Sequence, residues 1–441
     1  MDVRVKRLNP SGDNILIQGN LKVEGDYLYD VRPSNFVDVA AGANGDYFIL
    51  DSTKGRVFAY DEEGNLLYIF GGAGNSQMGS FSDPVAVEIV NGRVLVLDRG
   101  NCSVTAFEGT DYVSLLNSAQ STYRDGHYEE SYKQWTEVLK LNGNFRLAYQ
   151  KAGYCQYRMH AYKNAMDLFR AGGASSQYSK AFEKYRQEWI SQYFAWLVSG
   201  VAVLAGLVAF LVIRRARRRS RLSIVDTYYI ANSNEPFFRK NFKLAYNTMF
   251  HPVDNFWNIR FEKRGSIPAA TLFIFLLFLV LIFNRQMRGF LFNPHYGTDL
   301  DLGYQFGLVA ALIILPVLSN WSITTLMDGK GSIRDIYCVI GYSLLPVIII
   351  VPLTAVITRG LTLNELAYVN LADGLAYGWT LLLIVFGIKE IHQYSWAKTI
   401  ATLLLTVAAA AIILFICLLF FSLLQEILGF VYSIRKEIAL R

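Results

Sequence analysis

Apolar residues are unevenly distributed along the chain. From residue 194 onward they form long continuous runs, whereas before it they occur in short segments interrupted by polar residues. The first run, Phe194–Ile213, carries no charge and is followed at once by a cluster of arginines: Arg214, Arg215, Arg217, Arg218, Arg219 and Arg221. About 20 apolar residues, each adding about 1.5 Å of helix, cross a hydrocarbon core of roughly 30 Å. This run therefore predicts a membrane-spanning helix.

Five further apolar runs predict five further spans. They are Ile267–Phe283, Tyr304–Ile323, Ile336–Ile357, Gly374–Ile388 and Thr399–Leu424. Each is close to the length that a spanning helix needs. Because basic residues favour the cytoplasmic side, the arginine cluster places residues 1–193 outside the cytoplasm and residues 214–264 inside it. We expect a multi-pass protein of the cell membrane with an extracytoplasmic N-terminal domain.

Residues 1–110 contain two similar segments with a strand pattern. Phe36–Gly71 and Pro84–Phe107 each give a strand, an Asn-Gly turn, a strand ending in Leu-Asp, a polar turn and another strand. Their matching aspartates, Asp51 and Asp98, lie 47 residues apart (98 − 51). Repeats of about 40–50 residues built in this way are typical of propeller blades. Because a closed propeller needs about 4–8 blades, we expect a partial array, with Leu16–Tyr29 as a degraded third blade.

These segments resemble the NHL class of β-propeller. Arg56 and the Phe70-Gly71-Gly72 step match the pattern of that class, whereas Ser103 stands where a second arginine is expected. We expect the two matching aspartates to cap turns, with metal or ligand binding as the alternative.

Residues 111–193 change to a helical pattern. Two stretches 34 residues apart (162 − 128) correspond, with Tyr128 and Trp135 in the first and Tyr162 and Phe169 in the second. This period resembles the tetratricopeptide repeat. The packing of that repeat predicts that the four aromatic side chains fill the space between paired helices. With about two repeats, we expect a spacer or a single docking face rather than a deep groove.

The segment between the first two spans, residues 214–264, is basic and aromatic. Within it, Pro236–Phe250 places five apolar residues on one helical face: Phe238, Phe242, Ala245, Tyr246 and Met249. This pattern predicts an amphipathic helix in the membrane headgroup layer, and a helix docked on protein is the alternative. Residues 425–441 predict a second amphipathic helix at the C-terminus.

Residues from about 242 to 424 resemble the Yip-type family of five-span membrane domains. The residues that carry this resemblance are His251-Pro252, Phe256, Ile259-Arg260, Glu262 to Ser266, Asp328 to Ser332, Gly341-Tyr342 and Pro346. The resemblance implies a five-span core, residues 265–424, with its N-terminal side in the cytoplasm. In eukaryotes this family is associated with Rab GTPases and vesicle traffic. The propeller-like and repeat segments depart from the short eukaryotic form and indicate a bacterial protein.

A short charged loop lies on the predicted cytoplasmic side of the core. It contains Asp328, Gly329, Lys330, Gly331 and Arg334. Two interpretations are open: a solvated turn whose glycines supply special backbone angles, and a docking loop for a cytoplasmic partner. The Gly-Lys-Gly-Ser sequence lacks the spacing of a phosphate-binding loop.

Composition and charge narrow the range of functions. The formal net charge of +6 comes mostly from the arginine cluster and the basic segment after it. Since no nucleic-acid recognition module accompanies this charge, we expect it to meet anionic lipid headgroups. The 5 histidines are scattered, the 4 cysteines form no metal pair, and no hydrolase or nucleotide-binding motif occurs. We therefore expect neither enzyme activity nor a cofactor.

The sequence thus predicts a multidomain membrane protein that serves as a scaffold or accessory subunit. Partial propeller-like blades and tetratricopeptide-like helices precede an α-helical bundle of about six spans. The expected partners are lipids, other membrane proteins such as subunits of a saccharide transporter, and an extracytoplasmic protein or saccharide. Two alternatives stay open: a transporter or channel formed by the core itself, and a membrane-trafficking or membrane-shaping factor.

The beginning of the chain raises a separate question. Met1–Arg7 is charged and no apolar core follows it, so it does not form a signal peptide. Either the first span exports the domain that precedes it, or the natural chain begins upstream of Met1. We favour the second.

Overall fold

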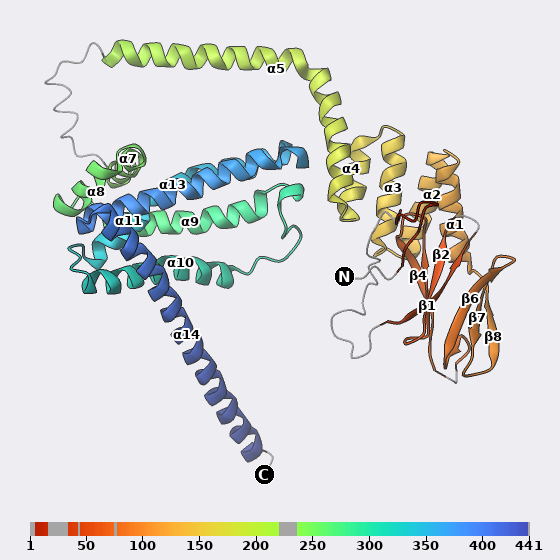
Figure 1. The fold of residues 1–441 in the computed structure, drawn as a ribbon. Coiled ribbons are helices and arrows are strands. Elements are labelled where there is room, and N and C mark those ends of the chain that lie inside the picture. Colours follow the sequence, from red (N-terminus) through yellow and green to blue (C-terminus); the bar gives the residue numbers. More distant parts are fainter. Residues whose placement is uncertain (1–4, 16–33, 43–44, 75–76, 220–235, 440–441) are drawn as a thin grey trace. The chain divides into compact units, whose positions relative to one another are not determined.

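The protein forms two compact units, Met1–Tyr185 and Arg186–Arg441. Its computed structural model describes residues 5–15, 34–42, 45–74, 77–219 and 236–439 (Figure 1). The predicted third blade, Leu16–Tyr29, lies outside the described residues. The boundary between the two units falls within one long helix, α5 (Ser175–Arg219).

The first unit begins with two sheets. The larger has the order β1 (Phe36–Ala41), β2 (Tyr47–Asp51), β3 (Arg56–Tyr60), β4 (Leu66–Ala73) and β5 (Ser80–Phe81), antiparallel except for the last pair. The smaller is the antiparallel series β6 (Pro84–Val90), β7 (Arg93–Asp98) and β8 (Ser103–Phe107). Apolar residues of both sheets share one core. The described strands form two open sheets rather than a closed propeller, so the NHL resemblance stays a prediction.

The turns of the two sheets explain the repeated Asn-Gly and Leu-Asp steps. Asn91 and Gly92 both have left-handed backbone angles, with φ of 53° and 76°, as a tight hairpin between β6 and β7 requires. Asp98 accepts hydrogen bonds from the backbone N–H groups of Asp83 (2.9 Å) and Gly100 (3.0 Å). Asp51 accepts equivalent bonds at the end of β2. The turn-capping role expected for both aspartates is therefore confirmed.

Four helices follow the sheets. They are α1 (Asp111–Arg124), α2 (Tyr128–Leu141), α3 (Arg146–Arg158) and α4 (Tyr162–Ala171), and each packs against the next. Trp135 and Phe169 are buried in two cores, and Tyr162 is buried with its ring against that of Tyr157. Gly153 lies against the Phe169 ring, because a Cβ at this glycine would come within 2.8 Å of it. This packing is compatible with the predicted repeat, and the assignment to the tetratricopeptide family stays a prediction.

The second unit contains the predicted spans. After α5 come α7 (Phe237–Phe250), α8 (Pro252–Phe261), α9 (Ile267–Met287), α10 (Leu302–Leu326), α11 (Ile333–Ser343), α12 (Leu345–Ile357), α13 (Leu366–His392) and α14 (Trp396–Ala439). Short 3₁₀ turns η1 (Phe290–Phe292), η2 (Thr358–Gly360) and η3 (Leu363–Glu365) lie between them. Within the described ranges, 6 helical segments are long and apolar enough to cross a membrane, in agreement with the six predicted spans.

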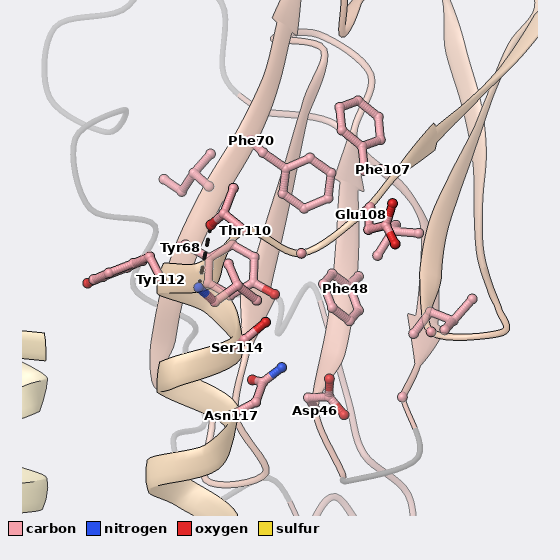
Figure 2. Close-up of a pocket in the computed structure, with 17 residues that line it drawn as sticks. Asp46, Phe48, Tyr68, Phe70, Phe107, Glu108, Thr110, Tyr112, Ser114 and Asn117 are labelled. Atoms are coloured by element: carbon pink, nitrogen blue, oxygen red, sulfur yellow. Dashed lines mark hydrogen bonds between the residues drawn. The ribbon is translucent and has the colours of Figure 1, made fainter. Parts of the chain in front are cut away.

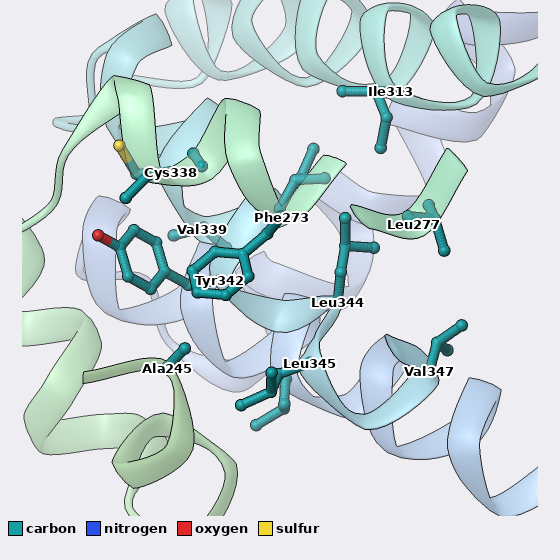
Figure 3. Packing of buried hydrophobic residues seen from close by; sticks show 14 of the residues in the cluster. Ala245, Phe273, Leu277, Ile313, Cys338, Val339, Tyr342, Leu344, Leu345 and Val347 are labelled. Carbon is teal, nitrogen blue, oxygen red and sulfur yellow. The ribbon is translucent and has the colours of Figure 1, made fainter. Parts of the chain in front are cut away.

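One predicted span differs from expectation. Ile336–Ile357 was expected as a single helix, but it is divided into α11 and α12 at Leu344. Pro346 stands in the first turn of α12, where its missing N–H costs little. This divided span is the most buried of the six, and Figure 3 shows Tyr342, Leu344 and Leu345 in the packed centre of the bundle. The proline therefore marks a break in a central helix.

Close packing of α11 on α9 depends on a glycine. A Cβ at Gly341 would lie 2.6 Å from the Cβ of Ala270 and 2.8 Å from its Cα. Small residues let membrane helices approach closely, which is how such bundles gain packing energy without water to expel. Tyr342 and Phe273 pack beside this contact with ring centroids 5.4 Å apart.

The amphipathic helix expected at Pro236–Phe250 is present, but its apolar residues are divided between two faces. Ala245 and Met249 are buried against the bundle, whereas Phe238, Phe242 and Tyr246 are exposed. α7 contacts α8, α11 and α12. The helix is therefore docked on protein through one face and presents aromatic rings on another.

The last helix continues beyond the sixth predicted span. α14 extends without a break to Ala439, so the predicted amphipathic tail, residues 425–441, is part of the same helix as far as the structure describes it.

Candidate functional site

Three loops meet at one end of the bundle, which we call the basic end. Arg260 joins them: its guanidinium donates to the backbone oxygens of Ile391 and Lys330, the second at 3.0 Å. Arg334 donates to the backbone oxygen of Gly265 at 3.3 Å. These contacts bring together the three loops that the alternation of spans predicts on the cytoplasmic side. Cations at this end are Arg260, Lys263, Arg264, Lys330, Arg334, Lys389 and Lys398.

The glycines of the charged loop pack against a buried histidine. The N–H of Gly331 donates to Nδ1 of His392 at 3.2 Å. A Cβ at Gly329 would lie 2.6 Å from the same nitrogen, and one at Gly331 would lie 2.9 Å from the ring carbon Cε1. The residue with a left-handed backbone is Asp328, with φ of 53°. The glycines are therefore needed for close approach to the imidazole, and the expectation that they supply special backbone angles is wrong.

The charged side chains of this loop, Asp328, Lys330 and Arg334, are exposed. Ser332 and Asp335 form a reciprocal capping box that starts α11. Tyr394 stacks on His392 and donates its hydroxyl hydrogen to the backbone oxygen of Met327 at 3.1 Å. The loop therefore has a rigid base that presents two cations and a carboxylate to its surroundings.

The opposite end of the spans holds polar contacts that the sequence did not single out. Arg288 pairs with Asp373 at 2.9 Å, and Thr354 donates to the other oxygen of that carboxylate at 2.7 Å. Asp373 was missed because the predicted span began at Gly374, whereas α13 begins at Leu366. At this end Arg186, which precedes the first span, pairs with Glu365 at 2.9 Å. The loops that are predicted to lie alternately on the two sides of the membrane therefore lie alternately at the two ends of the bundle.

The arginine cluster follows the first span directly. Arg214 is exposed on α5, and the helix continues through Arg215, Arg217, Arg218 and Arg219, whose side chains lie outside the described residues, as does Arg221. The apolar part of α5 is entirely exposed in the structure, as expected for a span that faces lipid.

A cavity of about 720 Å³ lies between the sheets and α1 in the first unit. Figure 2 shows that its wall is formed by the rings of Phe48, Tyr68, Phe70 and Phe107, opposite Ser114 and Asn117 of α1. The Phe70 and Phe107 ring centroids are 4.8 Å apart. This pocket could not be predicted from the sequence, because its lining comes from both sheets and the first helix.

The charged residues that line this pocket are both carboxylates. They are Asp46 and Glu108, and Glu108 pairs with Arg93 at 3.5 Å beside the pocket. Burial, reinforced by the nearby Asp46, raises the pKa of the Tyr68 hydroxyl to about 12, so this group stays neutral at physiological pH. An aromatic wall with carboxylates at its edge favours neutral or cationic groups over anions.

A buried ion pair holds the helices on the larger sheet. Lys151 of α3 pairs with Asp61 at 3.1 Å and with Glu63 at 2.8 Å, beside the turn between β3 and β4. Burial lowers the pKa of this ammonium, but the two carboxylates outweigh that effect and the pKa is raised. The pair thereby joins α3 to the larger sheet, whose residues Phe48, Tyr68 and Phe70 line the pocket.

Among the described residues, no three His, Cys, Asp or Glu side chains are placed to hold a metal ion together.

Residues 246–419 match the family described as the Yip1 domain. The match begins within α7 and ends within α14, so it covers α8, the next four spans and part of the last span. Among curated proteins, none matches the chain. The match and the six apolar helices together fit a multi-pass membrane protein of the Yip type.

Proposed function

We propose that the chain is a non-enzymatic membrane scaffold or accessory subunit whose first unit binds an extracytoplasmic partner. The observation that carries this proposal is the pocket between the sheets and α1, whose wall is aromatic and whose charged lining residues are carboxylates. It offers apolar contact area and hydrogen-bonding groups without a cluster of catalytic side chains. The partner would be a membrane protein or its ligand, and a transporter of extracellular saccharides is the case that we favour.

Contacts inside the spans support a scaffold. Asn320 of α10 donates to the hydroxyl oxygen of Thr406 of α14 at 3.0 Å, and both side chains are buried. Hydrogen bonds of this kind join membrane helices to each other. This bond therefore joins α10 to α14 inside the bundle.

The proposed orientation places the first unit outside the cytoplasm and the basic end inside it. The arginines after the first span and the cations of the basic end both favour the cytoplasmic side. In this orientation the charged loop of Asp328, Lys330 and Arg334 is available to a cytoplasmic partner, and the pocket is available to an extracytoplasmic one.

The test is affinity purification in mild detergent from the native cells. The variant S114R/N117R carries arginine at two exposed pocket positions of α1. It is compared with the wild type and with a control, N164R, which adds an arginine at an exposed position on α4. We expect a stoichiometric partner with the wild type and N164R, and its loss with S114R/N117R. Recovery of the wild type alone, or equal recovery of the partner with all three proteins, would contradict the proposal.

A further inference from the structure

The helices α7 and α8 form a unit that no predicted span includes. They are joined at a single residue, His251, and Pro252 starts the second helix. α7 packs on α8, α11 and α12, and α8 packs on α13. We call Phe237–Phe261 the aromatic hairpin.

Two contacts show how far the hairpin extends along the bundle. At its far end, Arg260 binds the backbone oxygen of Ile391 at the basic end of α13. At its junction, Trp379 of α13 donates its indole hydrogen to the backbone oxygen of Met249 at 3.1 Å. Trp379 and Ile391 are 12 residues apart (391 − 379), which is about 18 Å of helix axis. The junction therefore lies beside the apolar part of a span, well below the basic end.

The hairpin has one face turned to the bundle and one turned outward. The buried face contains Asn241, Ala245, Thr248, Met249, Phe256 and Ile259. The outward face is a row of large apolar side chains: Phe238, Phe242, Tyr246, Phe250, Val253, Trp257 and Phe261. Within each helix most of these positions are four residues apart, the spacing of one helical stripe.

The composition of the outward face identifies what covers it. Tyrosine and tryptophan beside phenylalanine favour the boundary between headgroups and acyl chains, and the exposed cations Arg239 and Lys240 near the basic end suit anionic headgroups. Asp254 and His251 are exposed at the junction, so this end cannot lie in the hydrocarbon centre without a large cost. The last turn of α13 carries Lys389 and Glu390, so part of the 18 Å lies at headgroup level, and the junction lies below the headgroups but short of the hydrocarbon centre.

We propose that the aromatic hairpin enters the leaflet on the basic side junction-first and returns to the same side, with its aromatic row in contact with lipid. Phe250 of the outward row packs on Trp379 of α13, with ring centroids 5.6 Å apart, and Leu381 and Leu382 of α13 are also exposed. Lipid therefore covers both surfaces. The chain contacts the basic-side leaflet through this hairpin as well as through its spans.

The proposal is tested by fluorescence quenching in the full-length protein. Cysteine is introduced at the junction (V253C), at the basic end (E262C), or at an exposed position of the first unit (M78C), in a C102S/C417A background. The two remaining cysteines, Cys155 and Cys338, are buried. Each purified variant is labelled with an environment-sensitive dye and reconstituted into vesicles of phosphatidylcholine and phosphatidylglycerol. All three replaced side chains are exposed, so the substitutions leave the packed core unchanged.

We expect the dye at residue 253 to emit at a shorter wavelength than the dyes at residues 262 and 78. A lipid with a nitroxide near the glycerol end of its acyl chain should quench it, and aqueous iodide should not reach it. The dyes at residues 262 and 78 should respond to iodide in vesicles opened to both sides. Iodide quenching at residue 253 equal to that at residue 78 would overturn the proposal. Shielding from iodide without quenching by the nitroxide lipid would mean that another copy of the protein covers the hairpin, which also overturns it.

Discussion

The contact between Gly341 and Ala270 allows a quantitative test of the packed bundle. In Gly341→Ala, the new methyl group would lie 2.6 Å from the Cβ of Ala270, although ordinary contacts lie at 3.4–4 Å. The backbone of α9 is also within reach, so α9 and α11 must separate by about 1 Å, and overpacking of this kind costs about 1–3 kcal/mol. Alanine in a helix recovers about 0.5–1 kcal/mol relative to glycine. We expect a net loss of about 1–2 kcal/mol in the free energy of unfolding.

A matched control removes the effect of helix propensity. A Cβ at Gly374 of α13 would meet no atom of another element within 4 Å, so Gly374→Ala should leave stability unchanged or raise it. The difference between the two variants isolates the packing term. The assay is the thermal midpoint of the purified proteins in one detergent, read by size-exclusion chromatography after heating.

A second substitution links the effect to its partner. Ala270→Gly in the Gly341→Ala background removes the opposing methyl group and should recover part of the lost stability, as residues in direct contact show coupling of about 0.5–3 kcal/mol. A thermal midpoint for Gly341→Ala at or above that of Gly374→Ala would refute the close contact between the two helices.

Three further predictions concern single contacts. Lys151→Met leaves the carboxylate of Asp61 buried with fewer partners and should lower the free energy of unfolding by about 1–3 kcal/mol. Lys140→Met, which removes an exposed ion pair, should stay within about 0.5 kcal/mol of the wild type. Thermal unfolding measures both. Backbone hydrogen bonds lower the pKa of Asp98 despite its burial, so its stabilising effect is present above the ordinary carboxyl pKa and is lost as the pH falls through the lowered value. Asp98→Asn should accordingly reduce stability at neutral pH and flatten its decline in acid, and identical pH profiles would argue against the capping role. Arg260→Ala should increase trypsin cleavage after Lys330 in opened vesicles, and Arg264→Ala, which removes only an exposed pair, should not.

The spans could be predicted from sequence because each depends on one local property, the length of an apolar run. Their ends were less accurate: the polar residue Asp373 belongs to α13 because Arg288 and Thr354, distant in the chain, satisfy its charge. The break at Leu344 could not be predicted from the presence of a proline alone. Pro316 and Pro352 lie inside continuous helices, whereas Pro346 follows a break.

The candidate sites could be predicted only in part, because they depend on tertiary contacts. The repeated Asp51 and Asp98 were recognisable because a turn is a local structure. The reason why glycine stands at positions 329 and 331 could not be recognised, because the histidine that both residues contact is about 60 residues away along the chain. The pocket in the first unit and the two faces of the aromatic hairpin likewise depend on which elements pack together.

The central claim is that the first unit and the basic end of the bundle lie on opposite sides of the membrane. It is tested by labelling intact cells with a membrane-impermeant maleimide, using the exposed native Cys102 in the first unit and, separately, K330C at the basic end in a C102S/C417A background. We expect Cys102 to react in intact cells and residue 330 to react only after the membrane is opened. Labelling of residue 330 in intact cells, with Cys102 protected until lysis, would contradict the account.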